Sequence, residues 1–344
     1  MWTTPSARAG VRSGKAGPSL ARCATARKET DIHLSPPIRD RQSFRHEALL
    51  WSNADDYREL LVPFVEEGLA GGEPVMVATI AEHEEWLRDG LGASARSVRF
   101  VDMAAMGRNP SRIIPAWQSF LDSAERGQPI RGIGEPIWPG RRPQEIAECQ
   151  LHEALLNIAV DPGLPFWLVC PYDVAGLGSS VVEAAACSHP ALLQTDGYHG
   201  SGGYGGRAHV DSLFTAVLDE LSGVPTETDY RRSTVGRLYP FVATEASRAG
   251  LSPVQASGLA AASQRLAAGS LQRGAESGRL AVWDQPDAVI CELRDDVTIV
   301  DPLVGRRRPL AADIDGLWYV NQHSDLVRLR SNADGTTVRI HVWK

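Results

Sequence analysis

A change in the spacing of apolar residues constrains the fold of this chain more than any other feature. As far as residue 190, short apolar runs such as 74–80 alternate with stretches such as 54–70, whose apolar residues recur at helical spacing. Beyond residue 275, apolar and polar residues alternate in RLAVW, AVICELR, DLVRLRS and TVRIHVW. The first pattern predicts a parallel sheet covered by helices on both faces, and the second predicts an antiparallel sheet.

Two helices are predicted before the antiparallel sheet, over residues 235–250 and 253–273. Ser252 followed by Pro253 is typical of an N-cap and a first helical position. A hairpin turn is predicted at 332–335, between the last two strands. Helices on one face of an antiparallel sheet form a two-layer α/β sandwich.

The 344 residues are enough for two domains, predicted at 43–192 and 233–344. Residues 193–232 contain GYHGSGGYGG and are predicted to be a Gly/Pro linker. This segment is not predicted to bind phosphate, because no Lys-Ser or Lys-Thr pair follows its glycines. Residues 1–42 are rich in Arg and Ser and poor in apolar residues, which predicts a disordered basic tail.

Composition excludes several classes of function. A net charge of −7 argues against a nucleic-acid-binding protein, and no apolar run is long enough to span a membrane. The five cysteines are scattered and form no CxxC pair. Together with the lack of a secretory h-region, this indicates a cytoplasmic protein.

The first half resembles a known sensory family. Its motifs occur in order as FRHEALLW, FVEEGLAGGEPVMV, GEPIWPGR, ECQLHEALLN, CPYD and SHP. They are similar to those of the MEDS domain, the sensory domain named after methanogens and methylotrophs. The resemblance implies a parallel-sheet core like that of RecA/KaiC-like ATPases, without a Walker A loop, and a small-molecule signal.

Polar residues in this half suggest where a signal would bind. In doubly wound sheets the ligand crevice lies at the carboxyl ends of the strands, where Glu135 and residues 170–173 are predicted. The alternative is that Glu135 and His46 tether helices, while Cys170 is a small buried hydrophobe. The pocket is expected to hold a small molecule or a metal, but no residue is assigned as a metal ligand, because His and Cys at such long separation fit no ligand motif. The residues singled out are His46, Glu135, Glu148, His152, Glu153, Cys170, Tyr172, Asp173 and His189, and the predicted pocket uses His46, Glu135, Cys170, Tyr172 and Asp173, with Trp138 beside it.

The last third resembles a second family. The segments DPLVGR, GLWYVNQ, DLVRLRS and GTTVRIHV look like the anti-sigma-factor serine kinases of the histidine-kinase-like (GHKL) ATPase group. The pairing of the two halves resembles the RsbA-type anti-sigma regulatory proteins of actinobacteria. This resemblance implies ATP and Mg²⁺ as cofactors. It also implies a sigma factor or an anti-anti-sigma (STAS-type) protein as partner.

Several positions depart from the kinase pattern. Arg265 and Gly269 stand where the family has a catalytic Glu and an Mg²⁺-binding Asn, so neither a base nor a metal ligand remains. Val297 and Ile314 replace glycines that let the adenine and the phosphates approach. The residual nucleotide contacts that the resemblance implies, if any remain, are Asp295, Gly316 and Leu317.

These departures favour a pseudokinase that regulates transcription by binding its partner, although enzymatic activity stays open. The alternatives are an active ATP-dependent serine kinase acting on an anti-anti-sigma protein, and a sensor with a scaffold tail. The basic run at 306–308 is interpreted either as a solvated loop or as a contact for an acidic partner.

Overall fold

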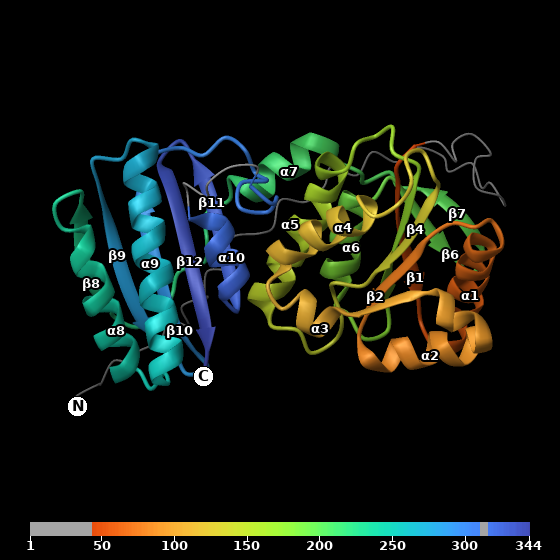
Figure 1. Ribbon diagram of the computed structural model, residues 1–344, viewed down its shortest axis with the longest axis horizontal. Helices are drawn as coiled ribbons and strands as arrows, with labels where there is room; N and C mark the ends of the chain where they lie inside the picture. The colour runs from red at the N-terminus through yellow and green to blue at the C-terminus, as the bar shows by residue number, and fades with distance from the viewer. Residues whose placement is uncertain (1–42, 310–315) are drawn as a thin grey trace, which may run out of the picture.

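The computed structural model describes residues 43–309 and 316–344. Two α/β units lie side by side, one built on a seven-stranded sheet and the other on a five-stranded sheet (Figure 1). This confirms the predicted mixed α/β class, with one mostly parallel and one antiparallel sheet. The predicted tail, 1–42, lies outside the described residues.

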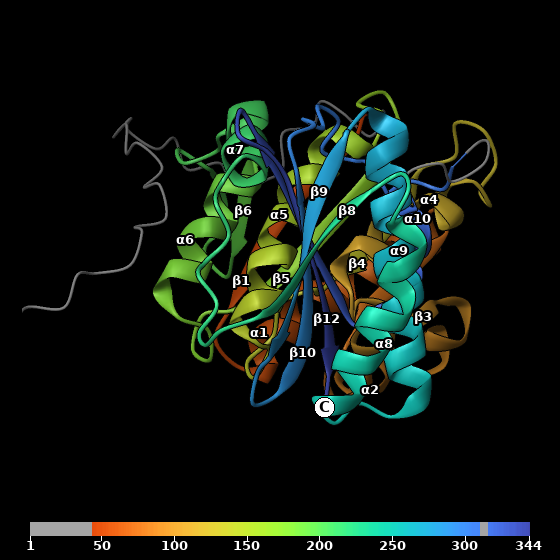
Figure 2. The same ribbon diagram turned by 90° about the vertical axis from the view of Figure 1, so that its left-hand side faces the viewer.

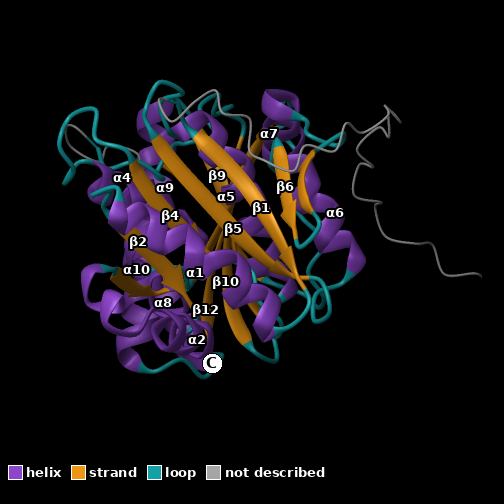
Figure 3. Ribbon diagram, turned by 90° about the vertical axis from the view of Figure 1, so that its right-hand side faces the viewer, coloured by secondary structure: helices purple, strands orange, loops and turns teal. Residues whose placement is uncertain are grey.

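The seven-stranded sheet forms the core of the first unit. Its strands are β1 (Arg45–Trp51), β2 (Val75–Thr79), β3 (Arg99–Asp102), β4 (Ile130–Gly134), β5 (Phe166–Asp173), β6 (Ala191–Gln194) and β7 (Gly197–Gly200). They are arranged in the order β3-β2-β4-β5-β1-β6-β7, with β1, β4 and β5 near the centre (Figure 3). Every pair is parallel except β6 with β7.

Helices cover both faces of this sheet, as the alternating pattern predicts. The α-helices are α1 (Ala54–Ala70), α2 (Ala81–Leu91), α3 (Met103–Met106), α4 (Ile113–Leu121), α5 (Pro143–Ala159), α6 (Ser179–Ser188) and α7 (Gly206–Phe214), and the 3-10 helices are η1 (Gly92–Ser97) and η2 (Pro110–Arg112). Leu49, Val77 and Val169 pack against α1 and α2 on one face. Ala48, Leu168 and Cys170 point to the opposite face and pack with α4 and α5. The odd and even residues of each strand therefore serve two separate cores.

The second unit is the predicted two-layer sandwich of helices on an antiparallel sheet. Its elements are β8 (Thr226–Arg231), η3 (Val235–Arg237), α8 (Leu238–Arg248), α9 (Pro253–Arg273), β9 (Ser277–Asp284), β10 (Ala288–Asp295), α10 (Leu317–His323), β11 (Leu326–Asn332) and β12 (Gly335–Trp343). The strands are arranged in the order β11-β12-β10-β9-β8. Figure 2 shows α8 and α9 beside this sheet. Ser252 caps α9 as predicted, in a capping box with Gln255.

The segment 193–232, predicted to be a linker, carries regular structure in three places. Strand β7 pairs with β6, α7 packs on α5, and β8 extends the second sheet as its edge strand. The sequence hides these elements because β7 is glycine-rich and β8, TETDYR, exposes most of its side chains. Neither shows the apolar periodicity by which strands are recognised.

The two units are joined by polar contacts as well as by a continuous apolar core. Asn109 Nδ2 and Arg112 Nε both donate to the backbone oxygen of Asn321, each at 3.0 Å. Arg112 Nη2 donates to Ser324 O at 2.9 Å. Across the described ranges, no helix is long and apolar enough to cross a membrane.

Candidate functional site

Four side chains that can bind metal ions meet inside the first unit, and we refer to them as the central cluster: His46, Glu153, Cys170 and His189. His46 on β1 is in register with Leu168, two residues before Cys170 on the adjacent β5. Both side chains point to the face that α5 covers, and α5 supplies Glu153. His189 follows α6, whose continuation Pro190 prevents.

The central cluster is compact and buried. Glu153 Oε2 lies 3.0 Å from Nε2 of His46 and 3.0 Å from Nε2 of His189. Cys170 Sγ lies 3.4 Å from His46 Nε2, and all four ligand atoms lie within 4.8 Å of one another. None of the four residues is more than 3% exposed.

Hydrogen bonds behind the cluster fix the orientation of both imidazoles. His46 Nδ1 lies 3.2 Å from Asn157 Oδ1, and His189 Nδ1 lies 2.8 Å from Ala185 O. The Asn157 amide nitrogen already donates to Ser188 O, so Oδ1 is the acceptor. Because both partners only accept, each Nδ1 carries the proton and each Nε2 faces the cluster.

Burial and mutual contacts set the protonation states in the cluster. Burial alone would raise the pKa of Glu153, but its close contacts with the rings of His189 and His46 outweigh this effect and hold the pKa below its ordinary range. Burial lowers the pKa of His46 and raises that of the Cys170 thiol well above its usual value. Without an ion, the cluster therefore holds an ionised carboxylate beside a protonated thiol.

A second buried polar cluster surrounds Glu135 on the opposite face of the sheet. His83 Nδ1 lies 2.8 Å from Glu135 Oε2, and the Thr79 hydroxyl also donates to that oxygen. The Tyr57 hydroxyl is 3.4 Å away. Burial raises the pKa of Glu135 in spite of these bonds. Thr79 ends β2 and Glu135 follows β4, so this group lies at the carboxyl edge of the strands, where a crevice was predicted.

The residues of the predicted pocket are thus divided between two places. His46 and Cys170 meet in the central cluster, whereas Glu135 belongs to the second cluster. The Tyr172 ring packs edge-on against His189, with ring centroids 5.7 Å apart. Asp173 accepts from two backbone N–H groups in the turn after β5. Trp138 stacks on a guanidinium, that of Arg141, at 4.3 Å.

Glu153 and His189 are candidate polar residues in the sequence, but neither is among the residues of the predicted pocket. Glu153 lies in the middle of a helix, where a polar residue normally marks the solvent side. His189 lies between a helix and a proline, as a capping residue would. The available signal is the pair Glu153 and Asn157, one helical turn apart, whose side chains both reach His46.

The same helix carries a buried carboxylate that faces the second unit. Glu148 Oε1 lies 2.6 Å from Arg330 Nη2 and 3.3 Å from Arg328 Nε, and its Oε2 lies 3.1 Å from Arg306 Nη2. Burial alone would raise the pKa of Glu148, but the three guanidinium groups outweigh it and lower the pKa. We call these four residues the arginine cluster.

The residues aligned with nucleotide contacts lie on α9, β10 and α10. Asp295 accepts from Val297 N at 2.9 Å and lies 3.9 Å from Arg273. Gly316 has φ of +70°, and a Cβ there would lie 2.7 Å from Arg265 Cγ. The Arg265 guanidinium lies 4.8 Å from the centre of the Tyr319 ring. Arg265 therefore packs directly against Gly316. Ile314 lies outside the described residues.

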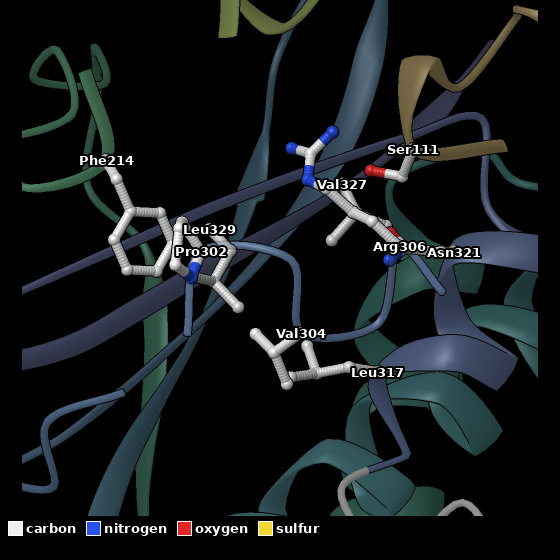
Figure 4. Close-up of a pocket in the computed structure, with 9 residues that line it drawn as sticks. All are labelled: Ser111, Phe214, Pro302, Val304, Arg306, Leu317, Asn321, Val327 and Leu329. Carbon is white, nitrogen blue, oxygen red and sulfur yellow. The ribbon is translucent and has the colours of Figure 1, made fainter. Parts of the chain in front are cut away.

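Leu317 and Gly269 are buried rather than open to a ligand. Leu317 lines a cavity between the two units together with Ser111, Phe214 and Arg306 (Figure 4). The cavity measures about 10 Å³, which is room for one water molecule. Gly269 lies within the buried face of α9.

Comparison with known proteins identifies the first unit. Residues 45–190 match the family model of the MEDS domain, described as the MEthanogen/methylotroph, DcmR Sensory domain. The chain therefore contains a MEDS domain, and this confirms the resemblance seen in its motifs. The domain includes the whole central cluster and α5, and it supports a role in signalling. No curated protein matches the chain.

Proposed function

We propose that this protein is a cytoplasmic signalling regulator whose MEDS domain senses an input at the central cluster. The second unit, a GHKL-like scaffold, binds a sigma factor or an anti-anti-sigma protein and so adjusts transcription. The observation that carries this proposal is the position of α5, which supplies Glu153 to the central cluster and Glu148 to the arginine cluster. One rigid element thus touches both the sensing site and the output unit.

The contacts of Glu148 support coupling between the units. Its three partners come from β11 and from the loop after β10, so a rotation of α5 strains strong charge-assisted hydrogen bonds in the second unit. An input at Glu153 that moves α5 therefore changes the free energy of the output unit. Such a differential interaction is what a switch requires.

The surroundings of Arg265 support the loss of ATP chemistry. A guanidinium cannot act as a base, and Arg265 packs on Gly316 and over Tyr319 beside the position aligned with the lid. A scaffold of this kind acts through protein contacts, since a fold does not by itself bring the catalysis of its relatives. We also propose that the parallel sheet of the first unit has the fold of RecA/KaiC-like ATPases.

The test is binding of the full chain to purified sigma factors and STAS-type proteins from the same source. We expect at least one partner to bind, and Glu148→Gln to change its affinity. Glu66→Gln, at an exposed position on α1, serves as the matched control. Failure of every purified candidate to bind would overturn the regulatory role.

A parallel titration of the full chain with Mg²⁺-ATP separates the pseudokinase from the active-kinase alternative. We expect no saturable binding, with Asp295→Asn as the control. Binding that this substitution abolishes, together with labelled phosphate transfer to a partner, would instead establish a serine kinase.

A further inference from the structure

We propose that the central cluster is a binding site for Zn²⁺, with Nε2 of His46, Nε2 of His189, Sγ of Cys170 and Oε2 of Glu153 as its four ligands. The sensory meaning of this site rests on the proposed function. The binding of the ion rests on geometry alone.

The spacing of the ligand atoms suits a tetrahedral ion. Zinc bonds to nitrogen, oxygen and sulfur place the ligand atoms about 3.3–3.8 Å apart around the ion. The closest pairs here are 3.0, 3.0 and 3.4 Å apart, and the widest separation is within 4.8 Å. The separations therefore lie on both sides of the range that a tetrahedral zinc site requires, and the widest exceeds it by at most about 1 Å.

The hydrogen bonds around the cluster match those around metal sites. Histidines that bind metals donate their other ring nitrogen to a carbonyl or carboxylate, which fixes the tautomer and the orientation of the ring. His46 and His189 do this through Asn157 Oδ1 and Ala185 O. Both Nε2 lone pairs are thereby directed at the Glu153 carboxylate, an unfavourable arrangement unless a cation or protons lie between them.

Two polar atoms in the cluster lack hydrogen-bond partners although they are buried. Glu153 Oε1 and His189 Nε2 have no hydrogen bond in the part of the chain that the structure describes. A buried polar atom without a partner is costly, and a native protein normally provides one. A bound ion supplies a partner for His189 Nε2 and lies within reach of the second carboxylate oxygen.

The charge balance also favours a divalent ion. When Zn²⁺ binds, the Cys170 S–H bond breaks, a Zn–S bond forms and the proton leaves to solvent. The thiolate and the Glu153 carboxylate then cancel the two charges of the ion, and the imidazoles are neutral. A site with no net charge suits residues at most 3% exposed.

The donor types select the class of metal. Imidazole and thiolate ligands favour Zn²⁺ over Mg²⁺ and Ca²⁺, which prefer sets made of oxygen ligands. Four protein ligands in a closed site leave no open position for water or substrate, as in zinc sites that hold structure. The ion would therefore set the position of α5 without catalysing a reaction.

The test measures metal content and affinity of the full chain. The protein is stripped with a chelator in denaturant, refolded with excess Zn²⁺ under reducing conditions and desalted before elemental analysis. We expect about one Zn²⁺ per chain, retained through desalting, with Co²⁺ giving thiolate-to-metal absorption at the same site. Wild-type protein that folds and retains no Zn²⁺ would overturn the proposal.

Variants identify the ligands. Cys170→Ser and Glu153→Gln are expected to lose the ion, and Asn157→Ala to weaken affinity by roughly 10- to 100-fold as an outer-shell partner. Cys291→Ser is the matched control, because Cys291 is equally buried but lies in the second unit. Circular dichroism verifies that each variant folds. Equal Zn²⁺ affinity in Cys170→Ser and Cys291→Ser would show that Zn²⁺ binds elsewhere.

The two proposals fail independently. If Zn²⁺ binds but leaves the affinity for a sigma factor or STAS-type partner unchanged, the metal site stands and its sensory role falls. If a partner binds and the wild-type chain takes up no Zn²⁺, the regulator stands and the metal site falls.

Discussion

Glu148 and Glu153 lie on one helix and are equally buried, yet their surroundings differ in kind. Glu148 meets three arginines from the second unit, whose charges are permanent at any physiological pH. Glu153 meets two histidines and a cysteine of its own domain, which together form the ligand set of the proposed Zn²⁺ site. The arginine cluster joins the two units, whereas the contacts of the central cluster stay within the MEDS domain. Carboxylates of similar depth on one helix therefore have a permanent counter-charge in one region and a set of possible metal ligands in the other.

The largest effect is expected from removing the charge of Glu148. Glu148→Gln leaves three buried guanidinium groups without their counter-ion, which we expect to reduce the free energy of unfolding by about 3–5 kcal/mol. Urea unfolding measures this. Glu66→Gln, on the exposed side of α1, should change this free energy by less than about 0.5 kcal/mol. An equal loss in both variants would show that the arginine cluster does not join the units.

Low pH should destabilise the fold near the arginine cluster, because His341 becomes protonated there. Burial, followed by the charges of Arg328 and Arg339, lowers the pKa of His341 to about 3. Because this pKa lies below the unfolded value of 6.5, the neutral ring stabilises the fold above pH 6.5, and the contribution is lost as the pH falls toward 3. The slope is at most about 1.4 kcal/mol per pH unit.

His341→Phe keeps a ring of similar size beside Trp343 and removes the titration. We expect its stability to depend less on pH between 6.5 and 3 than that of the wild type, as measured by urea midpoints across that range. Glu148 contributes in a lower window, because its lowered pKa means that its stabilisation is lost only below its ordinary pKa. Parallel pH profiles of the wild type and His341→Phe would contradict the assignment.

A smaller effect is expected at the neutral part of the interface. Asn109 is fully buried, donates to Asn321 O and accepts from Ser111 N. Asn109→Ala should cost about 1–2 kcal/mol, because both bonds are lost but Arg112 still donates to the same carbonyl. Thermal unfolding measures the loss. If Asn109→Ala lowered the free energy of unfolding as much as Glu148→Gln, charged and neutral contacts would stabilise the interface equally.

The smallest effect is expected at the exposed edge of the interface between the two units. Arg108 pairs with Asp325 at 2.9 Å, but its side chain is 52% exposed. Arg108→Ala should therefore change the free energy of unfolding by less than about 1 kcal/mol, and this difference should shrink further in high salt. If Arg108→Ala lowered the free energy of unfolding by several kcal/mol and salt did not reduce this loss, exposed ion pairs would stabilise the interface as strongly as buried ones.

The sequence predicts the bounds of α9, because Ser252 and Pro253 mark its start. It does not predict that α5 is buried on most of its surface. Glu145, Glu148, His152 and Glu153 are all buried, although polar helix residues normally face water. Their hydrogen-bond and ion-pair partners come from distant segments of the chain, so only the tertiary structure explains why polar residues are buried there.

Single residues of the site can be predicted from the sequence, but their grouping into clusters cannot. His46 and Cys170 are found from their strands, but the division between the two clusters depends on which face each side chain points to and which helix covers it. Likewise, Arg306 belongs to a basic run predicted to be solvated or to meet an acidic partner. It is 4% exposed and meets a carboxylate of its own chain, Glu148. Sequence shows the charge of such a residue, but not whether its partner is internal.

The position of both carboxylates on α5 also constrains how the length of this chain can vary. Glu148 and Glu153 are separated by about 7.5 Å along the helix axis and by about 140° around it. Inserting or deleting one residue between them would turn one carboxylate by about 100° relative to the other. Either the domain would lose Glu153 from its cluster or the second unit would lose its counter-ion. The stretch from 148 to 153 can therefore exchange residues during evolution but cannot change in length.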